Sequence, residues 1–206
     1  RTVTGVQTCA LPIYPDRFDA AYYRRFYGRR GVHDAERIAH LAAGVHELSA
    51  WWGVRIRSVL DVGAGTGLWR DWYLRTHPTV RVTSVDVSEY ACATWGHQRR
   101  DIAEWRPTRP FDLVVCHGVL HYVDDRRVDQ AIDNLAAATR HVLYLELPTA
   151  GDLRDVVDPE RTDLQAHRRS GAWYRRRLGT HFRQVGAGLW VPHDGVPMFE
   201  LEAADR

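Results

Sequence analysis

The sequence contains no lysine, so all 28 of its basic residues are arginine. This absence excludes Schiff-base chemistry on a lysine and the lysine of a P-loop. Cysteine is also scarce. The three cysteines, Cys9, Cys92 and Cys116, are odd in number and lack the spacing of metal ligands. They argue against a disulfide framework or a metal site and favour a reducing, cytoplasmic compartment. No apolar run approaches the roughly 18 residues of a membrane span, which predicts no membrane partner.

Net charge is low as well, since +2 at pH 7 is too small to indicate an acidic partner. An apolar content of 45% with 26% charged residues is ordinary for a soluble globular protein. A chain of 206 residues is long enough for one hydrophobic core. We therefore expect a single domain over residues 14–206. Residues 1–13 resemble a translated sequencing adaptor, and the alternative interpretation is a flexible tail. In either case we expect them to take no part in the fold.

The chain is organised around the stretch from Val59 to Trp69, in which a buried apolar strand runs into Gly63, Gly65 and Gly67 and then into a helix. Glycines at this spacing permit a sharp turn and close approach of a ligand to the backbone. Such a strand, loop and helix are typical of a nucleotide pocket in an α/β sheet.

Strands and helices are expected to alternate along the rest of the chain. Strands are predicted at 58–62, 80–87, 111–117 and 141–147, with a weak one before Asp101, and helices at 34–52, 68–75, 88–95, 124–139 and 172–178. Residues 150–170 are predicted to form a loop or short helices. Two final strands, 182–191 and 197–203, are joined by a turn at 192–195. The predicted fold class is α/β, a Rossmann-like, mostly parallel seven-stranded sheet with helices on both faces and a terminal antiparallel hairpin.

Two features of the loop bear on its ligand. The dinucleotide fingerprint G-x-G-x-x-G requires a glycine where Leu68 stands, which argues against NAD. Asp61, two residues before Gly63, would repel two phosphates but not a ligand that carries an ammonium and a sulfonium. The stretch from Asp61 to Gly67, Asp-Val-Gly-Ala-Gly-Thr-Gly, resembles motif I of the class I S-adenosylmethionine-dependent methyltransferases, and the resemblance extends over residues 58–147.

The resemblance implies S-adenosylmethionine as cofactor and assigns roles to residues at the strand ends. Asp86, followed by Val87, corresponds to the acid that binds both ribose hydroxyls, since a carboxylate offers two acceptors to two vicinal donors. Asp101 and Ile102 correspond to the pair that meets the adenine ring. The remaining cofactor-binding residues implied are Asp61, Gly63, Ala64, Gly65 and Gly67 in motif I, and Cys116 and His117 at the end of motif IV.

The resemblance divides the domain into an N-terminal helical segment (14–52), a cofactor-binding core (53–147) and a C-terminal part (148–206). In the N-terminal segment, residues 16–27 are dense in aromatics. Tyr22, Tyr23 and Tyr27 either fold over the ligand or simply pack on the domain.

Methyl transfer from a sulfonium is an in-line displacement that needs no metal and no covalent enzyme intermediate. A general base is needed only when the acceptor must lose a proton. His121 is the best candidate base because its ordinary pKa lies near neutrality. Tyr122 is the alternative, as a base or as an aromatic wall, and both residues have packing as the competing interpretation.

The acceptor is expected to be a small molecule. Nucleic acid is a second interpretation, carried by Arg168, Arg169 and Arg175–Arg177 with Trp173 and Tyr174 between them. Such a cluster is also typical of a solvated helix face. An NAD(P)-binding oxidoreductase and a cofactor-binding protein without turnover are the alternatives to a methyltransferase.

Overall fold

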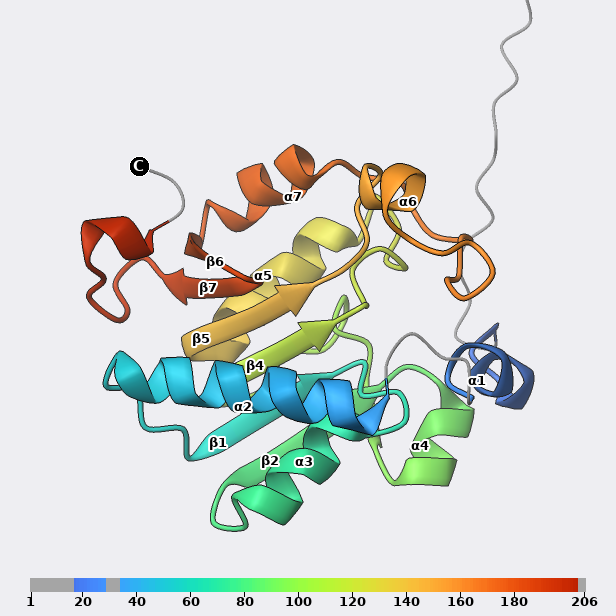
Figure 1. Ribbon diagram of the computed structural model, residues 1–206, viewed down its shortest axis with the longest axis horizontal. Helices are drawn as coiled ribbons and strands as arrows, with labels where there is room; N and C mark the ends of the chain where they lie inside the picture. The colour runs from blue at the N-terminus through green and yellow to red at the C-terminus, as the bar shows by residue number, and fades with distance from the viewer. Residues whose placement is uncertain (1–16, 29–33, 204–206) are drawn as a thin grey trace, which may run out of the picture.

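The computed structural model describes residues 17–28 and 34–203, so the expectation for residues 1–13 lies outside the described residues. Within that part of the chain, seven strands form one sheet with the order β3-β2-β1-β4-β5-β7-β6 (Figure 1). The strands are β1 (Ser58–Val62), β2 (Arg81–Asp86), β3 (Gln98–Arg99), β4 (Phe111–His117), β5 (Thr139–Glu146), β6 (Phe182–Gly186) and β7 (Leu189–Pro192). The first five run parallel, whereas β7 is antiparallel to both β5 and β6. The predicted fold class is confirmed.

Helices cover both faces of the sheet, with α2 and α3 on the near side of Figure 1 and α5 on the far side. The helices are α1 (Ala20–Phe26), α2 (Ala35–Trp51), α3 (Leu68–Thr76), α4 (Glu89–Trp95), α5 (Val128–Ala138), α6 (Asp152–Asp155) and α7 (Gly171–Leu178). Neighbouring residues of a strand point to opposite faces. Accordingly, Val59 packs in the core under α2 and α3, and Leu60 in the core under α5 and α7. This burial on both faces explains the continuous apolar runs of the central strands.

The terminal hairpin exists, but its predicted position was wrong. The chain reverses at Ala187 and Gly188, between β6 and β7, and not at residues 192–195. Gly186, Ala187 and Gly188 all have positive φ (102°, 49° and 77°), which two glycines tolerate easily. A Cβ on Gly188 would lie 2.8 Å from Cε2 of Tyr144. The second predicted strand, 197–203, instead contains a short 3-10 helix, Glu200–Glu202.

Candidate functional site

The carboxyl ends of β1, β2, β4 and β5 meet at one edge of the sheet, and α1 lies at the same end of the molecule (Figure 1). Two cavities, of about 730 Å³ and about 490 Å³, open along this edge. Open α/β sheets bind their ligands at this place. The residues that line both cavities are Tyr22, Tyr27, Gly63, Gly118 and Tyr122. The site is therefore one crevice with two compartments.

The glycine loop after β1 is held in shape by β2. The amides of Gly63 and Ala64 donate to the carbonyl of Val85 over 2.8 and 3.0 Å. The amide of Gly65 donates to a carboxylate oxygen of Asp86 over 2.9 Å. Gly63 and Gly65 have positive φ, and a Cβ on Gly63 would lie 2.4 Å from Cγ2 of Val119. The loop requires glycine for its own conformation and presents bare backbone to the first cavity.

Asp86 ends β2 and lines the first cavity together with Val87. Its side chain is buried, and its second oxygen accepts the amide of Ser88 over 2.8 Å. Burial raises the pKa of Asp86, while the amides of Ser88 and Gly65 oppose the shift. Each carboxylate oxygen has two acceptor sites, so one hydrogen bond per oxygen leaves capacity for two further donors.

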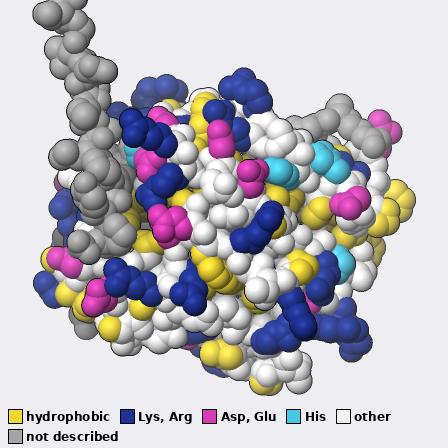
Figure 2. All heavy atoms as spheres, turned by 180° about the vertical axis from the view of Figure 1, so that it is seen from behind, with side chains coloured by type: hydrophobic (Ala, Val, Ile, Leu, Met, Phe, Trp, Pro, Cys, Tyr) yellow, Lys and Arg dark blue, Asp and Glu magenta, His cyan; other side chains and the backbone are white. Residues whose placement is uncertain are grey.

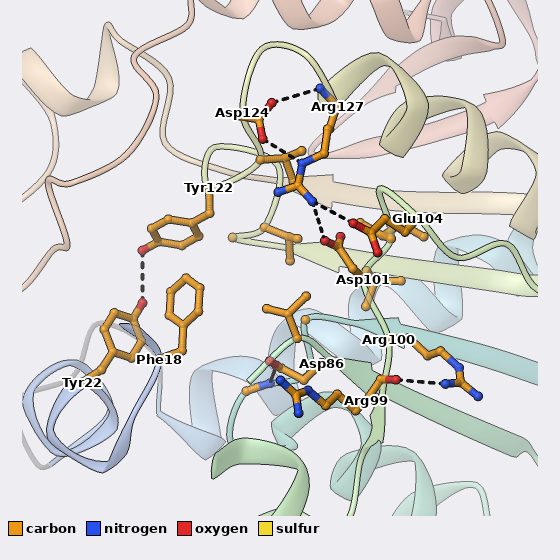
Figure 3. Close-up of a pocket in the computed structure, with 18 of the residues that line it drawn as sticks. Phe18, Tyr22, Asp86, Arg99, Arg100, Asp101, Glu104, Tyr122, Asp124 and Arg127 are labelled. Atoms are coloured by element: carbon orange, nitrogen blue, oxygen red, sulfur yellow. Dashed lines mark hydrogen bonds and ion pairs between the residues drawn. The ribbon is translucent and has the colours of Figure 1, made fainter. Parts of the chain in front are cut away.

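Asp101 and Ile102 lie farther along the same cavity. Asp101 accepts the amide of Ala103 over 2.9 Å and pairs with Arg127 over 3.0 Å. Arg127 also binds Asp124 and Glu104, and Figure 3 shows it bridging these three acids at one end of the cavity. Arg127 could not be identified from the sequence, because nothing near it in the chain points to an acid 26 residues earlier.

Asp61 lines the second cavity, together with Ala64. Its side chain is 2% exposed, and its Oδ2 atom has no hydrogen-bond partner among the described residues. Burial raises the pKa of Asp61 to about 7, and the backbone amide of Arg70 opposes that shift. A buried carboxylate oxygen without a partner is costly, and a cationic ligand beside it would remove the cost.

The other loop and motif IV residues differ in their access to the site. His117 lines the second cavity, and its Nδ1 accepts the indole N–H of Trp69 over 3.3 Å. Cys116 is fully buried in the core under α5, where burial raises the pKa of its thiol, and it lines neither cavity. Gly67 also lines neither cavity. It is the N-cap residue of α3 and has a φ of 80°. Cys116 and Gly67 therefore support the residues that line the cavities and do not line them themselves.

His121 and Tyr122 both reach the site, but neither is set up as a strong base. His121 lines the second cavity, is 3% exposed, and has an Nδ1 atom without a partner in the described part of the chain. Burial and the charge of Arg169 lower the pKa of His121 to about 3, so it is neutral and weakly basic. Burial raises the pKa of Tyr122, which keeps the hydroxyl protonated.

The aromatic N-terminal segment lies over both cavities. Tyr22, Tyr23 and Tyr27 line the first, and Tyr22 and Tyr27 also line the second. The hydroxyls of Tyr22 and Tyr122 point toward one another and lie 3.1 Å apart (Figure 3). Tyr122 also donates to Asp163 over 3.1 Å. The segment thus covers the crevice, and the Tyr22–Tyr122 contact joins it to the opposite wall of the crevice.

A salt bridge strengthens this connection. Arg17, just before α1, pairs with the same Asp163, whose side chain is 6% exposed. The partners are 146 residues apart in sequence, so no local pattern indicated the contact.

The arginine cluster considered for nucleic acid is partly used inside the protein. Arg169 is buried, pairs with Asp125 over 2.6 Å and donates to two backbone carbonyls. Arg177 lies over the ring of Trp173 and pairs with Asp129 over 2.7 Å. Figure 2 shows arginines spread over the face behind the view of Figure 1, with acidic side chains between several of them.

Two further features are absent from residues 17–28 and 34–203. No group of three or more histidine, cysteine, aspartate or glutamate residues there is arranged to hold a metal ion. No helix in the same residues is long and apolar enough to cross a membrane.

Comparison with known proteins places the chain among methyltransferases. A family model described as a methyltransferase domain matches residues 33–189, which is more than half of the chain. No curated protein matches the sequence.

Solved structures share the fold at low sequence identity. The plantazolicin methyltransferase with S-adenosylhomocysteine has a TM-score of 0.64 and 13% identity, over 82% of this chain and 73% of that one. The N-methyltransferase NodS from Bradyrhizobium japonicum WM9 has a TM-score of 0.59 and 16% identity, over 87% and 100%. The magnesium protoporphyrin IX methyltransferase from Synechocystis PCC 6803 has a TM-score of 0.57 and 18% identity, over 92% and 100%. The chain belongs to the methyltransferase-domain family, within the class I S-adenosylmethionine-dependent methyltransferases.

Proposed function

We propose that the two cavities divide the reaction between them. The adenosine part of S-adenosylmethionine occupies the first cavity, its methionine part passes Gly63 toward Asp61, and a small-molecule acceptor fills the rest of the second cavity. Gly63 and Gly118 line both cavities and lie where the methyl group crosses from one to the other. The family membership of the chain supports methyl transfer as the activity.

The donor and acceptor groups of the site fit this cofactor. Asp86 has free acceptor capacity for the two ribose hydroxyls. Asp101 and the backbone at Ile102 lie farther along the cavity, where the adenine ring would bind. The unpaired Oδ2 of buried Asp61 suits the ammonium of the methionine part, and this atom is the observation that carries the assignment. A dinucleotide would place phosphates near the same carboxylate.

The bound cofactor would supply a methyl group on a positively charged sulfur. The contribution of the protein is to hold the acceptor in line with that group and to exclude water. Tyr22 and Tyr27 cover the crevice, and the contact of Tyr22 with Tyr122 fixes the cover across the site. Neutral His121 can hydrogen-bond the acceptor but is a weak proton acceptor. This favours an acceptor that does not need a strong base.

A small molecule is the acceptor that the second cavity fits best. A volume of about 490 Å³ with mainly apolar walls lies in the usual range for small ligands. Internal use of Arg169 and Arg177 removes two of the five arginines that would contact phosphates. The structural neighbours include a plantazolicin methyltransferase, whose name indicates an acceptor other than nucleic acid.

The test is a methyl-transfer assay with S-adenosylmethionine labelled on its methyl group, against a small-metabolite extract and against total RNA. We expect label in the metabolite fraction and none in RNA, and Asp86→Ala should reduce transfer. Titration with NAD, NADP and S-adenosylhomocysteine is run on the same preparation. Binding of a dinucleotide without binding of S-adenosylhomocysteine would overturn the assignment. Cofactor binding without transfer to any fraction would indicate a binding protein without turnover.

A further inference from the structure

Acidic side chains dominate the charged lining of the second cavity. Its charged lining residues are four acids and one arginine: Asp61, Glu146, Asp152, Asp163 and Arg161. The apolar and aromatic lining residues include Phe26, Ile38, Leu68, Trp69, Leu147, Pro148, Val156 and Val157. The compartment therefore suits a ligand with an apolar body and a positive charge.

Three of these acids already have a role. Asp152 accepts the amide and hydroxyl of Thr149 over 2.8 and 2.7 Å. Asp163 is bound by Arg17 and Tyr122. Asp61 is assigned above to the cofactor.

Glu146 remains without a role. It is exposed, and its carboxylate accepts the hydroxyl of buried Tyr144 but makes no ion pair with residues 17–28 or 34–203. The tyrosine fixes the direction of the carboxylate without neutralising its charge.

The position of Glu146 matches the dimensions of a small acceptor. It ends β5 beside His117, the last residue of β4, while Cys116 of β4 pairs with Val62 of β1. Neighbouring strands lie about 4.8 Å apart, so Glu146 is about 10 Å from the start of the glycine loop. His121 lines the same cavity with a buried Nδ1 atom that has no partner in the described residues. This second polar atom also indicates that the compartment accommodates a ligand.

We propose that the methyl acceptor is an amine whose nitrogen is held by Glu146 in the second cavity. This inference rests on the proposed function. The ammonium form first gives a proton to the Glu146 carboxylate, which is exposed and passes it to solvent. The nitrogen lone pair then forms the N–C bond while the C–S bond breaks, and its electron pair stays on sulfur. The positive charge thus moves from sulfur to nitrogen, where the acidic wall stabilises it, whereas the same wall repels a phenolate or carboxylate acceptor.

The experiment compares three probes of the same shape and different charge: benzamidine (cation), benzamide (neutral) and benzoate (anion). Each is titrated by calorimetry into the full chain saturated with S-adenosylhomocysteine. A charge-assisted hydrogen bond to Glu146 should make benzamidine bind at least about tenfold more tightly than benzamide, and benzoate should bind least. Glu146→Gln, which can still accept the hydrogen bond of Tyr144, should remove this preference.

Asp155→Asn is the matched control, because Asp155 is an exposed carboxylate on α6 that does not line the cavity. It should keep the preference for benzamidine. Equal binding of the three probes, or a preference that survives Glu146→Gln, would overturn the amine proposal while S-adenosylhomocysteine still binds. Failure of S-adenosylhomocysteine to bind the natural chain would instead refute the cofactor assignment. The two failures are therefore distinguishable.

Discussion

The titration of Asp61 predicts how cofactor affinity depends on pH. The pKa of Asp61 is raised to about 7, chiefly by burial and also by the nearby charges of Asp86 and Asp71, while Arg70 opposes the shift. The ionised form should bind the ammonium of S-adenosylhomocysteine, which stays protonated between pH 6 and pH 8. With a pKa of about 7, about 9% of Asp61 is ionised at pH 6 and about 91% at pH 8. The dissociation constant should therefore be about tenfold higher at pH 6 than at pH 8.

The same titration has the opposite effect on stability. The folded-state pKa of Asp61, about 7, lies above its ordinary value of 3.8, so the folded state binds the extra proton between these values. The free energy of unfolding should fall as pH rises through this window, by on the order of 4 kcal/mol, and then level off above pH 7. Ligand affinity and apo-protein stability thus change in opposite directions over overlapping pH ranges.

Asp61→Asn separates these effects. The variant should bind S-adenosylhomocysteine weakly at every pH, and it should unfold at higher urea concentration than the natural chain at pH 8. Calorimetric titration and urea denaturation at pH 6, 7 and 8 measure both quantities. The reasoning is refuted if the natural chain binds equally at all three pH values, or if Asp61→Asn retains the tenfold change.

Four other residues give direct tests. Asp86→Ala should weaken S-adenosylmethionine binding by about 1–3 kcal/mol, measured by calorimetry, and unchanged affinity would contradict its assignment to the ribose. Tyr122→Phe should leave any increase of kcat with rising pH in place, since the hydroxyl is not the base, and loss of that increase in the variant would show the opposite. Arg169→Ala should destabilise the fold by about 3 kcal/mol in urea denaturation because it leaves the buried carbonyls of Leu120 and Val123 without this donor. Arg176→Ala at an exposed position should change stability by less than about 0.5 kcal/mol. Cys116 should react with a thiol reagent only after unfolding, as mass spectrometry of labelled peptides would show, and rapid labelling of the native chain would contradict its burial.

Local sequence predicted the central strands well where a buried apolar run is bounded by turn-forming residues. The bounds predicted for β1 and β4 are those observed, because each strand is an apolar run buried on both faces. The predicted hairpin failed because the proline and Asp-Gly at 192–195 are a strong turn signal, whereas the actual turn needs positive φ at Ala187. The turn also brings Gly188 so close to Tyr144 that a Cβ would not fit, and sequence pattern does not reveal this tertiary contact.

The residues of the candidate site also differ in how far the sequence could predict them. Strand-end residues such as Asp61 and Asp86 were predictable because topology brings parallel strand ends together. The contacts that shift the pKa values of these residues come in part from segments of the chain distant in sequence. The burial that makes His121 a weak base depends in the same way on tertiary packing. The link from Arg17 to Asp163 and the place of Glu146 in the second cavity depend on the packed loops above the sheet.

The shared wall between the cavities bears on the order of events in turnover. Tyr22 and Tyr27 line both compartments, so a displacement of α1 would uncover the two at once. The spent cofactor and the methylated product would then depart through the same opening, and their release rates would be coupled. Two contacts hold this cover on the body of the domain, the ion pair of Arg17 with Asp163 and the hydroxyl contact of Tyr22 with Tyr122. A slow final step of the catalytic cycle would accordingly reflect rupture of these two contacts and not the transfer of the methyl group.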